Sequence, residues 1–429
     1  MPEPDDLAKA LVAEQFSRSD GVLHVGGLDV RTLSDTHGTP LFLYDADLMR
    51  RAYRTLAQAV SGFAEVVYSV KANPDPAIIR IFAQEGAGAE IASGAEFAAA
   101  CAAGVSPDRI LFAGPGKSDA DIARVVAAGI GEIHLENAEE TARVALAAGH
   151  QGRTQRVAIR INPGPDAQGG AMRMGGKPSP FGFDEEDLDA VVDAVEAEPH
   201  LHLSGIHLFA GTQGLIAGTL LAQWAYGLRL AARVAARIGR RLDTVDLGGG
   251  LGIPYFSGDT ALDLAALHAG IPVLKELVAG NPNLAGARIV LEPGRYLAGP
   301  AGLYVARVRA VKRSRGTRFV ITDGGMHHHL AASGNLGQIV KRDYPLVAVV
   351  DRPETPRSPC AVVGPLCTPL DMLARAATLP DLAPGDLVAV LQSGAYGLTA
   401  SPTGFLGHPR PAEILVDGGV ATAIGRRDA

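Results

Sequence analysis

Residues 65–73 have the sequence EVVYSVKAN, an apolar and β-prone run that ends in one charged side chain, Lys71. Val and Tyr favour a packed, pleated surface, so the run predicts a buried strand with an amine at its mouth. An amine partly withdrawn from water is a competent nucleophile toward an aldehyde, because burial disfavours its charged form. Most lysines at strand ends simply extend into solvent. Lys71 therefore gains significance only from the residues that follow it along the chain.

Short β-prone runs alternate with Ala-rich segments from residue 65 to residue 292. Regular alternation of strands and helices over this length predicts a (β/α)8 barrel. The eight predicted strands cover residues 65–71, 89–93, 109–113, 132–135, 156–161, 202–207, 243–247 and 287–292. The predicted helices between them cover residues 75–85, 94–103, 118–128, 139–148, 185–198, 218–239 and 262–279.

The residue pattern changes after Arg295: Val-rich runs replace the Ala-rich segments and are separated by Pro and Gly turns. Runs such as 303–308, 319–322 and 387–391 predict a second, mostly β domain. The segment 24–30 is also strand-like and precedes the barrel, so we expect it to pair with this domain. The predicted organisation is an N-terminal segment at 1–38, a barrel at 39–295 and a C-terminal β domain at 296–429.

The composition of the chain limits the kinds of partner it can bind and the cellular location we expect for it. The chain has 429 residues, 47% of them hydrophobic, and a net charge of -7. This acidic balance disfavours nucleic acid and anionic membrane surfaces, because both attract basic patches. We find no long apolar stretch, and the acidic N-terminus lacks the apolar core of a signal peptide, so we expect a cytoplasmic protein. The cysteines form no CxxC pair, which excludes a disulfide framework or a thiolate metal site.

Polar and glycine residues follow the last three predicted barrel strands, where the loops of such barrels build active sites. Thr212 follows the sixth strand, glycines occupy 248–250 after the seventh, and EPGR occupies 292–295 after the eighth. A glycine run lets backbone N–H groups approach a phosphate, although it also makes a tight strand-to-helix turn. The carboxylate and guanidinium of EPGR could form a surface ion pair, or Glu292 could keep the pyridine nitrogen of pyridoxal phosphate protonated. The forked donors of Arg295 suit a phosphate or a substrate carboxylate.

Three further motifs lie in the predicted β domain. Cys367 occurs in a turn, GPLCTPLD at 364–371, and Tyr396 lies between glycines. Lone cysteines are usually buried filler, but a thiol can also donate a proton. The triple histidine at 327–329 suggests a metal, yet consecutive residues converge poorly on one ion, so we predict no metal site. We expect one or two of these histidines to line a substrate entrance instead.

Taken together, the motifs resemble those of the fold type III pyridoxal-phosphate decarboxylases, which include diaminopimelate and ornithine decarboxylases. The resemblance extends from about Gly38 to Gly418. It implies an alanine racemase-like barrel with a β domain, pyridoxal 5'-phosphate as cofactor and an obligate homodimer whose active site is shared across the interface. The matching motifs, in family order, are YSVKAN at 68–73, DLGGG at 246–250, EPGR at 292–295, GPLC at 364–367, SGAY at 393–396 and PRPAE at 409–413.

The resemblance also implies a role for each matching residue. Lys71 would form the Schiff base with the cofactor, and Glu292 would face the pyridine nitrogen. Phe209 stands where diaminopimelate decarboxylases have a histidine under the ring, and a phenyl face can also stack there. Cys367 would reach across the dimer interface and return a proton to Cα after carbon dioxide leaves. The implied phosphate positions are Gly248, Gly249, Gly250, Gly294 and Arg295, joined by Thr212 and Tyr396.

Departures from the family pattern concern the substrate. Diaminopimelate decarboxylases have a glutamate after the catalytic cysteine, which holds the distal amino group, whereas this chain has Thr368. Their arginine and tyrosine after the Gly-Gly-Met element are not evident here. The chain is therefore more similar to natural-product decarboxylases of antibiotic biosynthesis that act on a glutamyl, aspartyl or methylaspartyl group carried on an acyl carrier protein. The implied substrate residues are Arg295, Thr368, Asp371 and Tyr396.

Three other functions stay open at this point. A decarboxylase of a free amino acid such as diaminopimelate, ornithine or lysine is the main alternative, with Asp371 available for a distal ammonium. A racemase is disfavoured by Glu292, because racemases of the alanine type have an arginine at the ring nitrogen. A non-catalytic homologue that binds a partner protein is disfavoured because it would need neither Lys71 nor Cys367.

Overall fold

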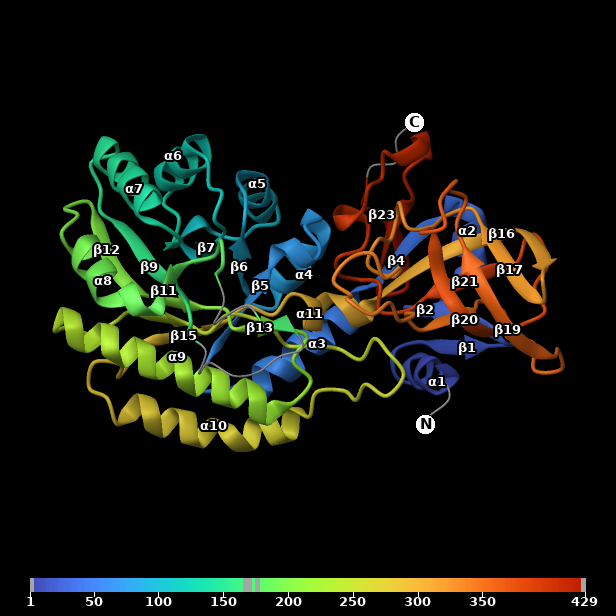
Figure 1. The fold of residues 1–429 in the computed structure, drawn as a ribbon, viewed down its shortest axis with the longest axis horizontal. Coiled ribbons are helices and arrows are strands. Elements are labelled where there is room, and N and C mark those ends of the chain that lie inside the picture. Colours follow the sequence, from blue (N-terminus) through green and yellow to red (C-terminus); the bar gives the residue numbers. More distant parts are fainter. Residues whose placement is uncertain (1–3, 165–171, 174–177, 426–429) are drawn as a thin grey trace. The chain divides into compact units, whose positions relative to one another are not determined.

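The computed structural model describes residues 4–425 apart from 165–171 and 174–177, and the chain divides into two compact units. The barrel unit comprises residues 52–253 and 261–296, and the β unit comprises residues 1–51, 254–260 and 297–429 (Figure 1). Strand β4, Leu41–Asp45, pairs with two strands of the β unit, which accounts for the assignment of the residues around it to that unit.

The barrel unit contains a closed parallel barrel, which confirms the predicted fold class. Its strands follow one another in chain order, and the ring closes where β15 pairs with β5. Each barrel strand overlaps a predicted run. The barrel strands are β5 Glu65–Ser69, β6 Gly88–Ile91, β7 Ile110–Phe112, β8 Glu132–Leu135, β9 Gln155–Asn162, β12 Leu201–Leu208, β14 Thr244–Asp246 and β15 Arg288–Leu291. Shorter strands are β10 Met172–Arg173, β11 Phe183–Asp184 and β13 Gly211–Thr212.

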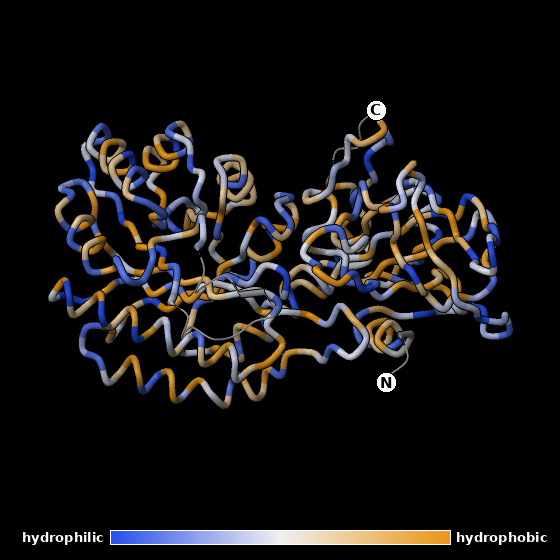
Figure 2. The backbone as a smooth tube through the Cα atoms, in the orientation of Figure 1, coloured by the Kyte–Doolittle hydropathy of each residue, from blue (hydrophilic) through white to orange (hydrophobic). Residues whose placement is uncertain are grey.

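Helices cover the outside of the barrel, and their starts are encoded locally. The side chains of Ser93, Ser118 and Asn137 accept hydrogen bonds from backbone N–H groups in the first turns of α5, α6 and α7. In α9 and α10 hydrophobic and hydrophilic residues alternate along the tube (Figure 2), as expected of helices with one buried face. The helices are α4 Pro76–Gln84, α5 Gly94–Ala102, α6 Asp119–Ala128, α7 Ala138–His150, α8 Leu188–Glu196, α9 Ala217–Ile238, α10 Leu264–Ala279 and α11 Arg295–Ala298.

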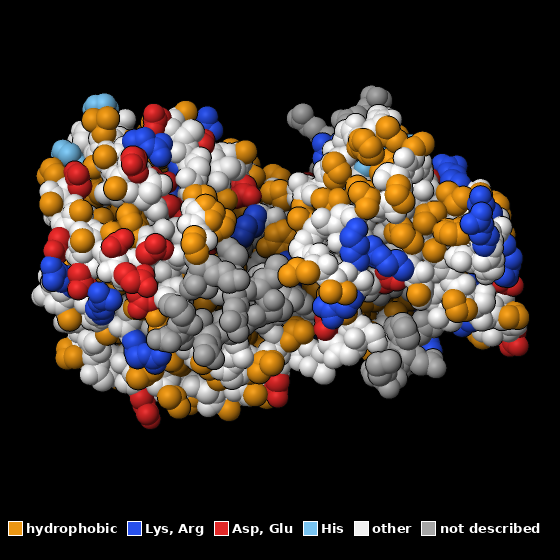
Figure 3. Space-filling view, in the orientation of Figure 1, with side chains coloured by type: hydrophobic (Ala, Val, Ile, Leu, Met, Phe, Trp, Pro, Cys, Tyr) orange, Lys and Arg blue, Asp and Glu red, His pale blue; other side chains and the backbone are white. Residues whose placement is uncertain are grey.

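Ion pairs connect α8 to the outer face and the end of α9. Arg233 and Arg237 of α9 pair with Asp189 and Asp193, and Arg240, just after α9, pairs with Glu196. Basic and acidic side chains are accordingly interspersed over the barrel unit on the face shown in Figure 3. Such exposed pairs are worth little individually, so the barrel is stabilised mainly by its apolar strands and inner helix faces.

The β unit is built around the long strand β16, which pairs with β4, β17 and β21. Its main sheet has the order β20-β19-β17-β16-β4-β22-β23. The strands are β4, β16 Gly302–Ser314, β17 Thr317–Thr322, β18 Leu346–Ala348, β19 Arg357–Val363, β20 Met372–Pro380, β21 Leu387–Val390, β22 Ala412–Asp417 and β23 Val420–Ala423. The N-terminal part contributes β1 Ser17–Ser19, β2 Val22–Val25, β3 Leu28–Asp29 and the helices α1 Pro4–Gln15 and α2 Val30–His37, whereas α3 Ala46–Ala59 starts in this unit and belongs to the barrel unit from residue 52 on.

The N-terminal strands form a small antiparallel sheet of their own, β1-β2-β3. A bridge between Val22 and Val350 and a hydrogen bond of 2.9 Å from Leu23 N–H to the Val349 carbonyl connect this sheet to later residues of the β unit. Val22, Leu23 and Val25 are buried in one hydrophobic cluster with Leu303 and Val305 of β16. The early segment is therefore an integral part of the core of the β unit.

In the part of the chain that the structure describes, no helix combines the length and apolarity needed to cross a membrane.

The triple histidine lies in the interior of the β unit, and all three side chains are fully buried. The expectation that one or two of them line a substrate entrance is therefore wrong. His329 contacts Ser393 Oγ at 3.0 Å, and His328 Nδ1 lies 3.2 Å from Tyr304 Oη. The rings pack among aromatic side chains. The sequence pattern alone does not distinguish this buried arrangement from an exposed polar run.

Burial of these histidines predicts that the fold is sensitive to acid. Burial lowers the pKa of His327 to about 4 and the pKa values of His328 and His329 to about 3. The unfolded chain binds these protons near pH 6.5, so stability is complete above that pH and is lost as the pH falls toward 4. The expected loss is about 1.4 kcal/mol per histidine for each pH unit in this window.

Urea unfolding at pH 7.5 and pH 5.5 measures this loss. A His329→Asn variant should show a smaller difference between the two pH values, whereas the exposed His150, replaced by Gln, should leave the difference unchanged. Buried carboxyls such as Asp371, whose pKa is raised by burial, offset part of the loss at the lowest pH values. Equal stability at both pH values would contradict the neutral, buried state of the three rings.

Candidate active site

Lys71 lies directly after β5, in a short helical turn at Val70–Ala72. Its side chain is 45% exposed, and its Nζ donates to Glu90 Oε2 at 3.0 Å. Glu90 lies in β6, is fully buried and also accepts a hydrogen bond from Ser69 Oγ at 2.5 Å. The amine is therefore held at the mouth of the barrel by a fixed carboxylate. Sequence analysis missed Glu90, although an acidic residue within a buried strand signals a paired charge.

The glycines at 248–250 follow β14 and pack tightly on neighbouring backbone. A Cβ at Gly248, Gly249 or Gly250 would lie 2.4–2.5 Å from the carbonyl oxygen of Leu208, Glu292 or Gly211, respectively. Gly248 and Gly250 also have φ angles of 69° and 99°, which side chains rarely adopt. The glycines therefore let the loop lie against the ends of the strands that carry the other candidate residues.

Other predicted residues cluster around this loop. Phe209 follows β12, is half-buried, and its Cε2 would lie 3.8 Å from a Cβ on Gly249. Thr212 is half-buried in β13, which lies between β12 and α9 in the chain. Arg295 is half-buried at the first residue of α11. A Cβ on Gly294 would lie 3.0 Å from the Ser69 carbonyl oxygen, so this turn packs beside the strand end that carries Lys71. The structure brings these predicted residues to one end of the barrel.

Four buried polar side chains meet at one end of the barrel, three from barrel strands and Glu292 from the residue that directly follows β15. His134, His207, Asp246 and Glu292 each place one nitrogen or oxygen within 4.8 Å of the others. His207 Nε2 lies 3.4 Å from Glu292 Oε2, and His134 Nε2 lies 3.8 Å from Asp246 Oδ2. Asp246 Oδ1 accepts the Gly248 N–H at 2.8 Å, which links the cluster to the glycine loop.

Burial sets the charges in this cluster. It lowers the pKa of His207 to about 4, so the ring is neutral at pH 7. Burial and the charge of Glu292 raise the pKa of Asp246 well above its usual range. Burial opposes ionisation of Glu292 as well, but the contact with His207 and a hydrogen bond with Asp246 outweigh it and hold the pKa of Glu292 below its usual range. The site therefore presents Glu292 as a buried anion, which fits a protonated ring nitrogen.

Candidate residues of the β unit lie in two loops. Cys367 is exposed and Thr368 half-buried, whereas Asp371 is only 2% exposed. Asp371 Oδ1 accepts the Met326 N–H at 2.6 Å, and Oδ2 accepts the Leu366 N–H at 2.8 Å. One carboxylate oxygen thus holds the loop that carries Cys367 and the other holds the turn at Met326, which supports a structural role for Asp371. Tyr396 is half-buried and has a φ of 52°, a strained conformation of a kind that occurs at ligand sites.

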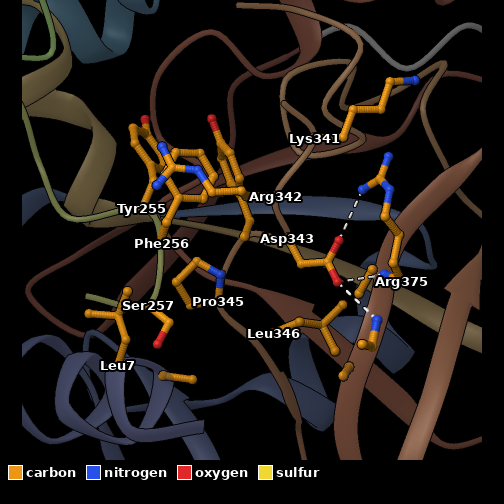
Figure 4. Close-up of a pocket in the computed structure, with 15 residues that line it drawn as sticks. Leu7, Tyr255, Phe256, Ser257, Lys341, Arg342, Asp343, Pro345, Leu346 and Arg375 are labelled. Carbon is orange, nitrogen blue, oxygen red and sulfur yellow. Dashed lines mark hydrogen bonds and ion pairs between the residues drawn. The ribbon is translucent and has the colours of Figure 1, made fainter. Parts of the chain in front are cut away.

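A cavity of about 330 Å³ in the β unit contains none of the predicted site residues (Figure 4). Tyr255, Phe256 and Tyr344 form an aromatic wall, and the Arg342 guanidinium lies 3.7 Å from the centre of the Phe256 ring. Asp343 and Arg375 form an ion pair of 3.0 Å on the other side. Three basic side chains and one acidic side chain, Lys341, Arg342, Arg375 and Asp343, line this cavity. Because it contains none of the predicted site residues, we do not count it as part of the active site.

Comparison with known proteins identifies relatives of this chain among the decarboxylases. Residues 46–299 match the family model described as pyridoxal-dependent decarboxylase, pyridoxal binding domain. The chain is 39% identical to the L-glutamyl-[BtrI acyl-carrier protein] decarboxylase of Niallia circulans over 93% of this chain and 94% of that one. It is 31% identical to the diaminopimelate decarboxylase of Aquifex aeolicus over 95% of this chain and 94% of that one. Diaminopimelate decarboxylase from Helicobacter pylori complexed with L-lysine superposes with a TM-score of 0.83 at 28% identity, over 94% and 97% of the two chains.

Proposed function

Because this chain belongs to the family of pyridoxal-dependent decarboxylases, we propose that it removes the α-carboxylate of an amino acid, of the glutamyl or aspartyl type, carried on an acyl carrier protein. The cofactor is pyridoxal phosphate, and the enzyme is a carboxy-lyase. The observation that carries the proposal is the higher identity to a carrier-linked glutamyl decarboxylase than to a diaminopimelate decarboxylase. A cytoplasmic location and a role in antibiotic-type biosynthesis belong to the same proposal.

The residues at the mouth of the barrel fit this cofactor. Lys71 would hold it covalently, with Glu90 orienting the amine at 3.0 Å. Glu292 is a buried anion beside a neutral His207, so its natural partner is a cationic ring nitrogen. The glycine loop and Arg295 would receive the phosphate, and Phe209 would stack on the ring. When bound, the cofactor supplies an electron sink for the pair of electrons that departing carbon dioxide leaves on Cα.

The remaining roles fall to the protein and the substrate. Arg295 and Tyr396 would orient the substrate, and Cys367 would return a proton to Cα. Thr368 offers no counter-charge for a distal ammonium. A side chain joined to a carrier through a thioester is neutral at that end, so an uncharged Thr368 suits it. The loop position of Thr368 next to the exposed Cys367 supports this assignment.

The test compares substrates on the cofactor-loaded enzyme. Glutamyl- and aspartyl-loaded carrier proteins are incubated beside free diaminopimelate, ornithine, lysine, glutamate and aspartate, and loss of carbon dioxide is followed by mass. We expect turnover of a carrier-linked substrate only, with the Lys71→Ala protein as an inactive control. Turnover of a free diamino acid alone would replace the proposal with the alternative function of the diaminopimelate decarboxylase type.

Thr368 should influence the choice of substrate. We expect Thr368→Glu to gain turnover of diaminopimelate by about tenfold or more, because a carboxylate would pair with the distal ammonium. The same change should weaken turnover of the carrier-linked substrate. Thr368→Val is the matched control, since it keeps the shape but adds no charge. Equal kcat/KM for diaminopimelate in the Glu and Val variants would contradict the assignment of Thr368 to the distal end of the substrate.

The proposal includes a homodimer, supported by exposed apolar side chains in the β unit. Ile339 is fully exposed, and Val340 and Leu370 are 74% and 49% exposed. Asn335 Nδ2 donates to the Leu370 carbonyl at 3.1 Å, so the loop of Ile339 is tied to the loop that follows Cys367. An apolar surface of this kind next to a candidate catalytic residue is expected to be covered by a partner.

Placing a charge on this surface should dissociate the dimer. Ile339→Asp should shift the protein toward monomers at micromolar concentration, and activity should fall with it, because buried charges without partners are costly. Light scattering coupled to gel filtration measures the shift. Exposed Leu146 on α7 of the barrel unit, replaced by Asp, is the control and should leave the mass unchanged. A dimer that persists in Ile339→Asp would place the interface elsewhere.

A further inference from the structure

The polar cluster around Glu292 contains more titratable groups than the proposed chemistry uses. Asp246 lies at the end of β14, His207 in β12 and His134 in β8, and all are fully buried. None of these three was assigned a role by the sequence motifs. Buried polar groups destabilise a protein unless they form hydrogen bonds. The hydrogen bonds available to this cluster therefore indicate its role.

The two carboxyl groups cannot both be anions without a partner. Asp246 Oδ2 and Glu292 Oε1 are buried and have no hydrogen-bond donor among the described residues if both groups are ionised. His207 does not supply the missing charge, since its contact with Glu292 is long at 3.4 Å and its ring is neutral at pH 7. His134 Nε2 is already directed to Glu132 Oε1 at 3.3 Å.

One carboxyl oxygen of Asp246 and one of Glu292 lie within 4.8 Å of each other, so a single proton held between the two groups can satisfy both orphan oxygens. Asp246 Oδ1 is fixed by the Gly248 N–H at 2.8 Å, which leaves Oδ2 to carry the proton and donate it toward Glu292. The opposite pKa shifts of the two groups, raised for Asp246 and lowered for Glu292, agree with this assignment. The groups that face the pair are His207, His134 with its partner Glu132, and the Gly248 N–H.

We propose that Asp246 is a positioning residue whose carboxylic proton is shared with Glu292, which keeps Glu292 ionised and fixes the oxygen that meets the cofactor ring. The inference rests on the proposed contact between Glu292 and the ring nitrogen. Through Gly248 it also joins the ring-nitrogen side of the site to the glycine loop. Asp246 would therefore act on the cofactor through other residues, without touching it.

Two substitutions of Asp246 distinguish the role of its carboxylic proton from the role of a negative charge at this position. Asp246→Asn keeps a donor toward Glu292 and an acceptor for Gly248, but it cannot ionise. Asp246→Ala removes the donor. We expect the cofactor dissociation constant, measured by titrating the cofactor-free protein, to rise by no more than about fivefold in the Asn variant and by about 30-fold or more in the Ala variant.

A second measurement does not depend on cofactor binding. The infrared difference spectrum of cofactor-free wild type minus cofactor-free Asp246→Asn at pH 7 should contain the carbonyl stretch of a protonated carboxylic acid. Other buried acids, such as Asp371, are present in both proteins and cancel. This readout stays informative even if Asp246→Ala fails to fold.

Several outcomes would overturn the inference. Absence of the carboxylic acid band would show that Asp246 is ionised. Equal loss of cofactor affinity in the Asn and Ala variants would show that the charge of Asp246 is what matters. A metal ion bound one per chain in the wild type and lost in Asp246→Asn would show that the four side chains form a metal site. Failure of the wild type to bind pyridoxal phosphate would instead refute the proposed function, and the infrared band would still report on the proton.

Discussion

Lys71→Ala should abolish covalent attachment of pyridoxal phosphate and reduce decarboxylation by a factor on the order of 10⁴. Without the amine, the cofactor aldehyde has no covalent anchor, and the absorbance of the bound cofactor near the visible edge should disappear. Glu90 would remain fully buried with Ser69 as its neighbour but without the contact of 3.0 Å to the lysine. The loss should therefore appear in both cofactor binding and turnover.

Chemical trapping identifies the lysine directly. Borohydride reduction of the cofactor-loaded enzyme followed by peptide mass analysis should place the label on the peptide that contains Lys71. Lys275, an exposed lysine on α10 of the same unit, is the matched control, and Lys275→Ala should keep both label and activity. A label on another lysine, or an unchanged spectrum in Lys71→Ala, would remove Lys71 from the active site.

The barrel was predictable from the sequence because its information is local. Each strand lies in a short β-prone run such as 65–71, and several of the helices start at a capping side chain such as Ser93 or Asn137. The segments are also regularly spaced, and this regularity leaves few alternatives to a closed parallel barrel. A glycine run at 248–250 was recognisable for the same reason, since the close backbone contacts there exclude side chains.

Partners that lie on different strands were not predictable in the same way. Glu90 and His134 lie within apolar strands, and their significance depends on Lys71 and Asp246, which are far away in the sequence. The histidines at 327–329 could equally have been an exposed polar run, and only packing against aromatic rings distinguishes the buried arrangement. In each case a polar residue within an apolar context was the available signal, but the sequence alone does not identify its partner.

Asp371 illustrates the difference between residue type and role. An acidic residue close to Cys367 was a reasonable candidate for binding a distal ammonium. In the structure both of its carboxylate oxygens accept backbone N–H groups of nearby turns, at 2.6 and 2.8 Å. The hydrogen bonds come from Met326 and Leu366, which are distant from each other in the sequence, so no local pattern announces them. With Asp371 holding the loop, the alternative function on a free diamino acid loses its proposed counter-charge.

Mixing two inactive variants should restore activity if the site is shared between subunits. In the proposed dimer, Lys71 of one subunit and Cys367 of its partner serve the same site, so Lys71→Ala and Cys367→Ala proteins are each expected to be inactive or nearly so. Random reassociation makes half of the dimers mixed, and each mixed dimer has one complete site of two, so activity should recover to about a quarter of wild type.

Two controls distinguish a shared site from a site contained within one subunit. In the first control, cofactor binding is measured for each variant alone: Cys367→Ala should retain pyridoxal phosphate, and Lys71→Ala should lose it. Adding Ile339→Asp to both proteins should prevent recovery, because it would block reassociation through the apolar surface of the β unit. If each site were contained within one subunit, every site of a mixed dimer would carry one of the two defects, and mixing would restore nothing. Recovery near a quarter would therefore place Cys367 opposite the lysine of its partner and make dimer formation a condition of catalysis.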